Sequence, residues 1–456
     1  MSEFFHKGQT LELNVERMAF GGRGIARTEG FVVFVDGALP GQKVRATVTK
    51  AAKRFAEADV DEVLEQTPHW TQPFCLHFGK CGGCQFQDLD YAEQLKWKTE
   101  HVGDQLTRIA RIEAPKIHPA QASPELRGFR NKMEFAFAGG GSESGPLSLG
   151  LHRKGSERIV NIEECHLPSP QCAEIVRHVR EFCRRTSIPS YDPRTRRGLW
   201  RFLVIRETKT TMQTMVQIIT SQAQDGGAIR SLADDLHQRF PALTTVVHST
   251  RKARSAIAHG ERQVFRTGDG YVMEQVGDIR YRISADSFFQ TNTPAAELLY
   301  AAACKAAGLT GTEHVLDLYC GSGGLGLAMA KQAASVTGIE TVPAAVRDAE
   351  ANAKLNEFTN CTFIAGDVLE KLKTLEQKPD VVVTDPPRSG MHPDAAAALL
   401  ELAPERIVYV SCNPSTLARD IKQLSGDYAL TEAWPFDLFP HSPHIECVAL
   451  LERLKS

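Results

Sequence analysis

One glycine-rich loop in the last third of the chain constrains the fold more than any other feature. An apolar run over residues 314–318 leads through Gly321, Gly323 and Gly324 into a predicted helix. Glycine lets a backbone come close to a ligand and adopt positive φ. Because strand-like and helix-like segments alternate from residue 286 to residue 456, we predict a parallel α/β sheet that binds ligands at the carboxyl ends of its strands.

The acids that end the following strands are more specific than the glycine loop itself. Glu340, Asp367 and Asp385 each follow a strand-like run. An acid there can hold ribose hydroxyls or accept a hydrogen bond from an adenine amine, although it can equally cap the next helix. Their order along the chain resembles that of class I S-adenosylmethionine-dependent methyltransferases. The resemblance implies a Rossmann-like α/β catalytic domain over residues 286–456, with S-adenosylmethionine as cofactor.

Cys412 stands between the strand-like run 406–410 and a predicted helix that opens at Asn413. A free cysteine is commonly a packing residue, but the end of a buried strand is where α/β enzymes place their chemistry. A thiolate that adds to carbon 6 of a pyrimidine makes carbon 5 able to accept a methyl group. A base must then remove the carbon 5 proton, and Glu446, at the start of a late predicted strand, suits that step.

Longer motifs around these residues resemble those of the RNA uracil-5 methyltransferases of the RumA/TrmA family. The matching segments are Ser287–Asn292, Asp385–Gly390, Ser411–Asp420 and Phe439–Glu446. The resemblance covers essentially the whole chain and implies that Cys412 is the nucleophile and Glu446 the base. It also implies a group of residues around S-adenosylmethionine and the target base, namely Gln290, Tyr319, Gly324, Glu340, Asp367 and Asp385.

The N-terminal residues 8–65 contain short strand-like runs between glycine-rich turns, which predicts a small OB-like β-barrel. Such barrels often bind nucleic acids through stacking and phosphate contacts. Side chains that could make these contacts are Phe20, Arg23, Lys50, Lys53 and Arg54. By resemblance, residues 1–65 are identified as the TRAM domain of the family.

Four cysteines form a candidate metal site in a chain that has 11. Cys75, Cys81 and Cys84 are close in sequence, and Cys165 lies far downstream. Their spacing alone leaves both zinc and an iron–sulfur cluster open. The family resemblance implies a [4Fe–4S] cluster, because the ribosomal-RNA branch of the family has this arrangement.

The segment 66–285 is expected to be an α+β central domain that carries the cluster and binds RNA. Its predicted helix over residues 91–111 could also pack on the catalytic domain. Two runs, 127–132 and 194–201, combine arginines with aromatic residues and could contact phosphates and stacked bases. Trp200 in the second run could equally belong to the core.

The combined prediction is S-adenosylmethionine-dependent formation of 5-methyluridine in RNA. The cysteine pattern favours 23S ribosomal RNA, and transfer RNA is the alternative. An amine methyltransferase also stays open, because Asp385-Pro386-Pro387 resembles the motif of adenine-amine enzymes. A cytosine-5 methyltransferase is a further alternative. An iron–sulfur RNA-binding or redox protein is the alternative of another class, although the intact catalytic set argues against it. Since no apolar run is long enough to span a membrane and no signal peptide is evident, we expect a cytoplasmic protein with no membrane contact. We also expect a monomer.

Overall fold

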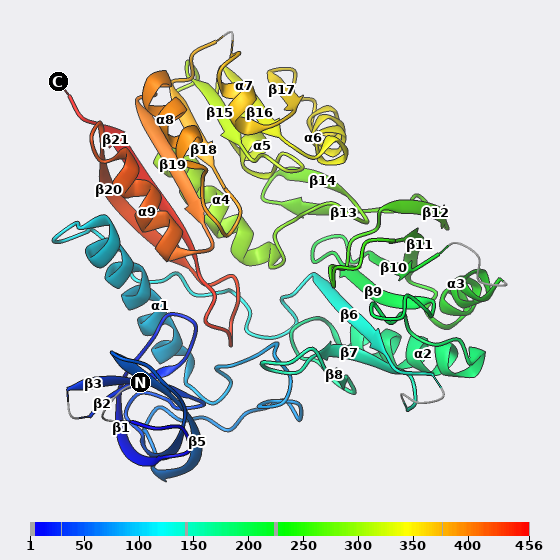
Figure 1. The fold of residues 1–456 in the computed structure, drawn as a ribbon. Coiled ribbons are helices and arrows are strands. Elements are labelled where there is room, and N and C mark those ends of the chain that lie inside the picture. The colour runs from blue at the N-terminus through cyan, green and yellow to red at the C-terminus, as the bar shows by residue number, and fades with distance from the viewer. Residues whose placement is uncertain (1–4, 29, 142–144, 223–226, 376, 456) are drawn as a thin grey trace.

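Four β-sheets follow one another along the chain and contain its described strands (Figure 1). The computed structural model describes residues 5–28, 30–141, 145–222, 227–375 and 377–455. The first sheet is a closed barrel, the second and fourth have seven strands each, and the third is a two-stranded hairpin. No helix among these residues combines the length and the apolar character needed to cross a membrane.

The N-terminal barrel closes in the strand order β1-β2-β3-β5-β4. Its strands are β1 (Thr10–Met18), β2 (Gly24–Thr28), β3 (Phe31–Asp36), β4 (Lys43–Ala51) and β5 (Phe55–Glu65). Small and β-branched side chains at alternate positions, among them Val33, Val44 and Ala56, fill the interior and are completely buried. The OB-like barrel predicted from the short strands and glycine turns is confirmed.

The middle sheet has the order β12-β11-β10-β9-β6-β7-β8. Its strands are β6 (Lys132–Ala138), β7 (Ser148–His152), β8 (Ile159–Asn161), β9 (Trp200–Glu207), β10 (Thr214–Thr220), β11 (Leu243–Thr250) and β12 (Arg262–Arg266). The helices α2 (Pro170–Thr186) and α3 (Ala228–Arg239) pack on it around one apolar core. Trp200 is completely buried in that core, so it is a core residue and not a stacking residue for RNA.

The C-terminal sheet has the order β17-β16-β15-β18-β19-β21-β20. Its strands are β15 (His314–Leu318), β16 (Ser335–Glu340), β17 (Cys361–Ala365), β18 (Val381–Thr384), β19 (Arg406–Ser411), β20 (Tyr428–Phe436) and β21 (Glu446–Arg453). The first five strands in this order are parallel, and β21 is antiparallel to both of its neighbours. The predicted Rossmann-like sheet is therefore confirmed, and its strand order reverses between β15 and β18, where such sheets bind ligands.

Helices cover both faces of this sheet (Figure 1). One apolar core contains residues of α4 (Thr293–Ala307), α5 (Gly324–Ala330) and α6 (Pro343–Leu355). The other contains residues of α7 (Val368–Leu372), α8 (Pro393–Leu402) and α9 (Pro414–Leu424).

Elements from earlier in the chain complete both cores. The helix α1 (Tyr91–Gln105) continues as a π-helical turn over Leu106–Ala110, and Val102 and Leu106 bury in the core beneath α9. The hairpin of β13 (Tyr271–Val276) and β14 (Ile279–Ser284) packs on the opposite core. These two elements attach the middle of the chain to the catalytic sheet, and the boundaries at residues 66 and 286 stay predictions.

Candidate active site

Cys412 and Glu446 lie on adjacent strands at the carboxyl edge of the parallel sheet. Cys412 directly follows β19, and Glu446 is the first residue of β21. The antiparallel register pairs Ser411 with Cys447. Cys412, which follows Ser411, therefore lies opposite Glu446, which precedes Cys447. Asn413 caps α9 by accepting a hydrogen bond from the Ser415 N–H at 3.1 Å, and this sharp strand-to-helix turn fixes the thiol at the edge.

Burial sets the protonation of this pair. Burial and the nearby carboxylates of Glu446 and Asp385 raise the pKa of the Cys412 thiol to about 11. Burial raises the pKa of Asp385 to about 7. Burial and then Asp385 raise the pKa of Glu446 well above its ordinary value, while Arg388 opposes the shift. The thiol therefore holds its proton at neutral pH, and burial shifts Glu446 toward its protonated form.

One oxygen of Glu446 has no partner. Glu446 is 4% exposed, and its Oε2 is buried without a hydrogen bond to any residue that the structure describes. Buried polar atoms in native proteins are normally paired. An unpaired carboxyl oxygen beside a half-buried thiol is consistent with a site that waits for a polar substrate group.

Four of the six predicted cofactor residues line one cavity next to this pair. The cavity lies where the strand order reverses, and its lining includes Gln290, Tyr319, Gly324 and Asp385. The Gln290 Nε2 donates to the Asp385 Oδ2 at 3.4 Å. The cavity thus joins the turn before α4, the glycine loop and the end of β18 in one place.

Two residues that the sequence reasoning missed shape the glycine loop. Asp317 is buried and accepts a hydrogen bond from the Gly326 N–H at 2.8 Å, and burial raises its pKa to about 8. A Cβ at Gly324 would lie 2.5 Å from the hydroxyl of Tyr300, so only glycine fits there. An acid within an apolar strand was a visible signal for Asp317, whereas nothing in its helix singled out Tyr300.

Glu340 and Asp367, the other two predicted cofactor residues, lie outside the cavity lining and bind backbone groups. The Glu340 carboxylate accepts from the Gly321 N–H at 3.1 Å and the Val342 N–H at 2.8 Å. Asp367 is the N-cap of α7 and accepts from the Leu369 N–H at 2.9 Å. The helix-capping alternative is therefore present at Asp367, and a cofactor role for either acid stays a prediction.

The four candidate metal-binding cysteines line one cavity between the segment 75–87 and residues 151 and 162–167. They are Cys75, Cys81, Cys84 and Cys165. Burial and the other thiols raise the pKa of Cys84 and that of Cys165 to about 12 each. Within the described residues, no three potential ligands converge to hold a single metal ion. A [4Fe–4S] cluster instead takes one thiolate on each of four irons, and four thiols around one cavity fit that number.

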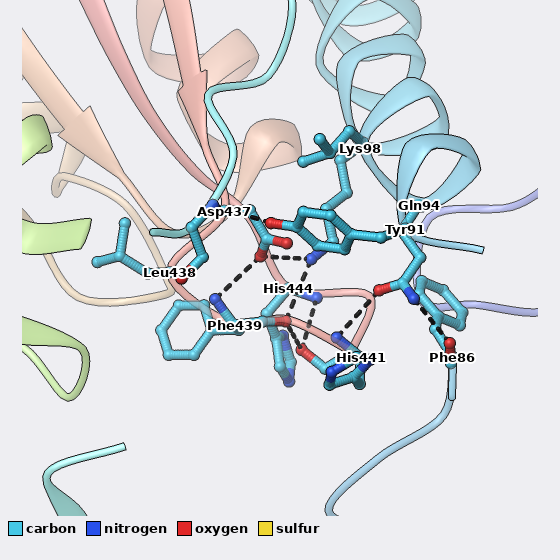
Figure 2. A network of polar contacts seen from close by, with 12 residues as sticks. Phe86, Tyr91, Gln94, Lys98, Asp437, Leu438, Phe439, His441 and His444 are labelled. Atoms are coloured by element: carbon cyan, nitrogen blue, oxygen red, sulfur yellow. Dashed lines mark hydrogen bonds and ion pairs between the residues drawn. The ribbon is translucent and has the colours of Figure 1, made fainter. Parts of the chain in front are cut away.

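The loop that precedes Glu446 is anchored by α1 (Figure 2). Lys98 on α1 forms an ion pair with Asp437 at 2.6 Å, with both side chains completely buried. The Lys98 Nζ also donates to the Phe439 carbonyl at 3.1 Å. Gln94, one turn earlier on α1, accepts from the His441 N–H at 3.0 Å. The position of Glu446 therefore depends on a helix that the sequence motifs did not include.

The same loop is tied to the cysteine segment. The backbone N–H groups of Gln85 and Phe86, which directly follow Cys84, donate to the His441 carbonyl at 2.8 and 3.0 Å. His441 has φ of 65°, an uncommon value for a non-glycine residue. These hydrogen bonds link the residues that follow Cys84 directly to the loop that precedes Glu446.

An open cleft of about 420 Å³ lies between the middle sheet and the catalytic domain. Its lining includes Arg130, Lys132, Phe288 and Arg388. Phe288 is 64% exposed, and Arg388 also lowers the pKa of Cys412 against the effect of burial. Glu134 also lines the cleft and is paired with Lys132 at 2.8 Å. A cleft with two arginines and an exposed aromatic ring suits single-stranded RNA, and contact between RNA and the run 127–132 stays a prediction.

The barrel residues proposed for RNA contact are only partly free. Arg23 lies 3.4 Å from the Glu57 carboxylate, and Lys50 lies 3.1 Å from it. Phe20 is 38% exposed, and Lys53 and Arg54 are exposed on the connection between β4 and β5. Their role in RNA binding stays a prediction.

Comparisons with known proteins agree with this geometry. A family model described as tRNA (Uracil-5-)-methyltransferase matches residues 229–454, and a TRAM domain model matches residues 5–60. A protein of Nitratidesulfovibrio vulgaris described as an RNA methyltransferase is 46% identical over 98% of this chain and 97% of its own. Another from Chlorobaculum tepidum is 38% identical over 98% and 97%.

A solved structure extends the likeness to three dimensions. The Pyrococcus abyssi tRNA (uracil-54, C5)-methyltransferase, in complex with S-adenosyl-L-homocysteine, superposes with a TM-score of 0.77 at 28% identity. The match covers 96% of this chain and 99% of that one.

The buried ion pair gives a first prediction. The substitution Lys98→Met leaves the Asp437 carboxylate buried without its partner, which should lower the free energy of unfolding by about 3–5 kcal/mol. Replacing both residues, as Lys98→Met with Asp437→Leu, should recover much of that loss because no lone charge is buried. Urea denaturation measures both. Lys96→Met on the exposed face of α1 is the control, and a Lys98→Met effect no larger than that of the control would contradict the argument.

The raised pKa of Asp385 predicts a pH dependence of stability. A carboxyl whose folded pKa is about 7 binds its proton more tightly in the folded state than in the unfolded state, where the pKa is about 4. Stability should therefore fall as the pH rises from about 4 to about 7. The substitution Asp385→Asn should flatten this dependence. Thermal unfolding at pH 5 and pH 7 tests it against Asp394→Asn, an exposed acid on α8, which should leave the dependence unchanged.

Proposed function

Because the chain belongs to the TRAM-containing family of RNA uracil-5 methyltransferases, we propose that it methylates carbon 5 of a specific uridine in RNA through a covalent thiol adduct. The observation that carries the proposal is the position of Cys412 opposite Glu446 at the edge of the sheet, next to the cavity of Gln290 and Asp385. An amine methyltransferase needs no such thiol, and an RNA-binding protein needs neither group.

In the proposed reaction, the Cys412 thiol first loses its proton. The thiolate sulfur then forms a bond to carbon 6 of the uracil ring, and the electron pair of the double bond moves to carbon 5. S-adenosylmethionine supplies the methyl group that carbon 5 then takes up. The Glu446 carboxylate removes the carbon 5 proton, the double bond re-forms, and the bond from carbon 6 to sulfur breaks to release Cys412 as thiolate. Its raised pKa makes Glu446 a stronger proton acceptor than an ordinary carboxylate.

Arg388 connects the RNA cleft to this pair. Its guanidinium lines the cleft and lowers the pKa values of both Cys412 and Glu446. A thiol with a pKa of about 11 is mostly protonated at neutral pH, so thiolate formation needs a nearby cation. We assign Arg388 the role of stabilising the thiolate while a phosphate or base occupies the cleft.

Substitution of the two catalytic residues tests the mechanism. With total RNA and labelled S-adenosylmethionine, Cys412→Ala should reduce methyl transfer to background. Glu446→Gln should lower turnover by about 10²–10⁴-fold and accumulate a denaturant-stable protein–RNA adduct, because methyl transfer precedes elimination.

Two substitutions on β21, the strand of Glu446, are matched controls. They are Cys447→Ala, at a buried cysteine, and Glu452→Gln, at the exposed end of the strand. Both variants should retain turnover, and neither should accumulate the adduct. Wild-type methylation by Cys412→Ala would exclude the nucleophile. Failure of the wild type to form an adduct with 5-fluorouridine RNA would favour an amine methyltransferase.

For the substrate we favour 23S ribosomal RNA, and transfer RNA is the second candidate. The four-cysteine arrangement supports the ribosomal choice by family resemblance, whereas the Pyrococcus abyssi relative is described as a tRNA enzyme. Mass mapping of both RNA classes from a deletion strain should show the loss of one 5-methyluridine in 23S ribosomal RNA. A loss confined to transfer RNA would reverse the choice, and 5-methylcytidine would change the target base.

We further propose that the four cysteines hold a [4Fe–4S] cluster that positions the segment following Cys84. Protein purified without oxygen should contain about four irons and four acid-labile sulfides per chain, and Cys84→Ser should lose most of them. Zinc in place of iron would contradict the cluster. Cys183→Ser, a buried cysteine outside the cavity, is the control and should keep the iron. The monomeric state and the cytoplasmic location stay predictions.

A further inference from the structure

A second large cavity lies on the middle sheet, apart from the catalytic cleft. Its volume is about 650 Å³, within the range of sites that bind small ligands. The ends of β6 and β9 form its floor, through Ala136 and Phe202, and loops supply the wall. The lining side chains that matter here are Tyr191, Arg194, Arg197, Arg201 and Arg254.

This cavity is rich in available positive charge. Arg194, Arg197 and Arg254 are exposed, and within the described part of the chain none of their guanidinium groups has a hydrogen bond or ion pair. Two acids, Glu157 and Asp192, also line the cavity. The Asp192 carboxylate already accepts hydrogen bonds from its own loop, namely from the Arg194 N–H at 2.8 Å and the Thr195 hydroxyl at 3.1 Å. The site therefore suits an anion.

An aromatic ring in the cavity is held rigidly. The Arg201 guanidinium lies 4.4 Å from the centre of the Tyr191 ring. Arg201 is itself fixed, because it donates to the Arg251 carbonyl at 2.6 Å and to the Ser255 carbonyl at 3.2 Å. Tyr191 remains partly exposed. A supported, partly exposed ring between arginines is the combination that binds an unstacked base and its phosphate.

The position of the cavity relates it to the catalytic cleft. Strand β6 begins at Lys132, which lines the cleft, and reaches Ala136, which lines the cavity. At about 3.3 Å per residue the two positions are about 13 Å apart along the strand. One RNA strand can therefore occupy both places.

We propose that this cavity binds an unpaired nucleotide of the substrate RNA, several nucleotides from the target, through Arg194 and Arg197 on phosphate and Tyr191 on the base. The proposal needs an RNA substrate but does not depend on which base is methylated. It extends the enzyme's contacts beyond the target uridine, so that RNA sequence or shape at a distance contributes to selection.

Binding of two single-stranded oligouridines by the full chain tests the proposal. One has about 4 nucleotides and can fill only one site, and the other has about 20. Fluorescence anisotropy between about 50 and 200 mM salt should show that Arg194→Gln with Arg197→Gln weakens binding of the longer RNA about tenfold. The same variant should reduce its salt dependence by about 1.4 in log–log slope. Tyr191→Leu should weaken the binding of the longer RNA and leave the salt dependence of that binding unchanged. Tyr191→Phe should bind the longer RNA like the wild type.

The matched control is Arg185→Gln with Arg239→Gln, which removes the same charge from exposed ends of α2 and α3. An unchanged affinity for the longer RNA in the Arg194/Arg197 variant, or a loss equal to that of the control, would overturn the proposal. So would uridine monophosphate binding to the wild type as tightly as the longer RNA, since that indicates a small-molecule site. Because the readout is binding, it is independent of whether Cys412 is the nucleophile.

Discussion

The ion pair between Lys98 and Asp437 is the interaction on which the active site most depends. Neither side chain is exposed, so each charge has lost its hydration, and only the partner and a few hydrogen bonds offset that cost. Burial lowers the pKa of Lys98, while Asp437 opposes the shift. With Gln94, the pair holds the loop that ends at Glu446. The base of the proposed reaction is thus placed by a helix outside the catalytic sheet.

The electrostatics at the carboxyl edge of the C-terminal sheet keep the Cys412 thiol weakly nucleophilic before RNA binds. The thiol, Asp385 and Glu446 all have raised pKa values, chiefly because they are buried. Arg388 opposes the shifts of Cys412 and Glu446, and it lies on the wall of the cleft proposed to bind RNA. A neutral thiol is a weak nucleophile, so a cofactor-filled site without RNA would have little reactivity toward other electrophiles.

The sequence was sufficient wherever chemistry followed the order of the strands. Cys412 follows β19 and Glu446 begins β21, and because these two strands are antiparallel neighbours, both residues lie at the same edge. The sequence paired them through the chemistry of the two groups and the resemblance of their motifs. Asp385 was singled out because it follows a strand-like run, whereas Gln290 was singled out only by the resemblance of its motif. Asp367 shows the limit of this logic, because an acid after a strand can serve the next helix, and here its carboxylate caps α7.

Long-range contacts escaped prediction for a physical reason. Lys98 and Gln94 lie on a helix whose polar residues could have faced solvent, and only the folded chain shows that they turn inward to the loop of Glu446. The second arginine run was expected to share a role with the first, yet its residues line a different cavity. Trp200 within it packs into the core because β9 is buried along its whole length.

The contact between Lys98 and Asp437 spans 339 residues, and this separation affects how the protein is made. During synthesis the helix that bears Lys98 leaves the ribosome more than 300 residues before the loop that it anchors. The barrel and the middle sheet can form in the meantime. Until the loop has been synthesised, however, Lys98 lacks Asp437, and the N–H groups of Gln85 and Phe86 lack the His441 carbonyl. Glu446, the proposed base, can therefore be set in place only after both the helix and this loop have been synthesised, so the proposed activity cannot precede that stage of translation.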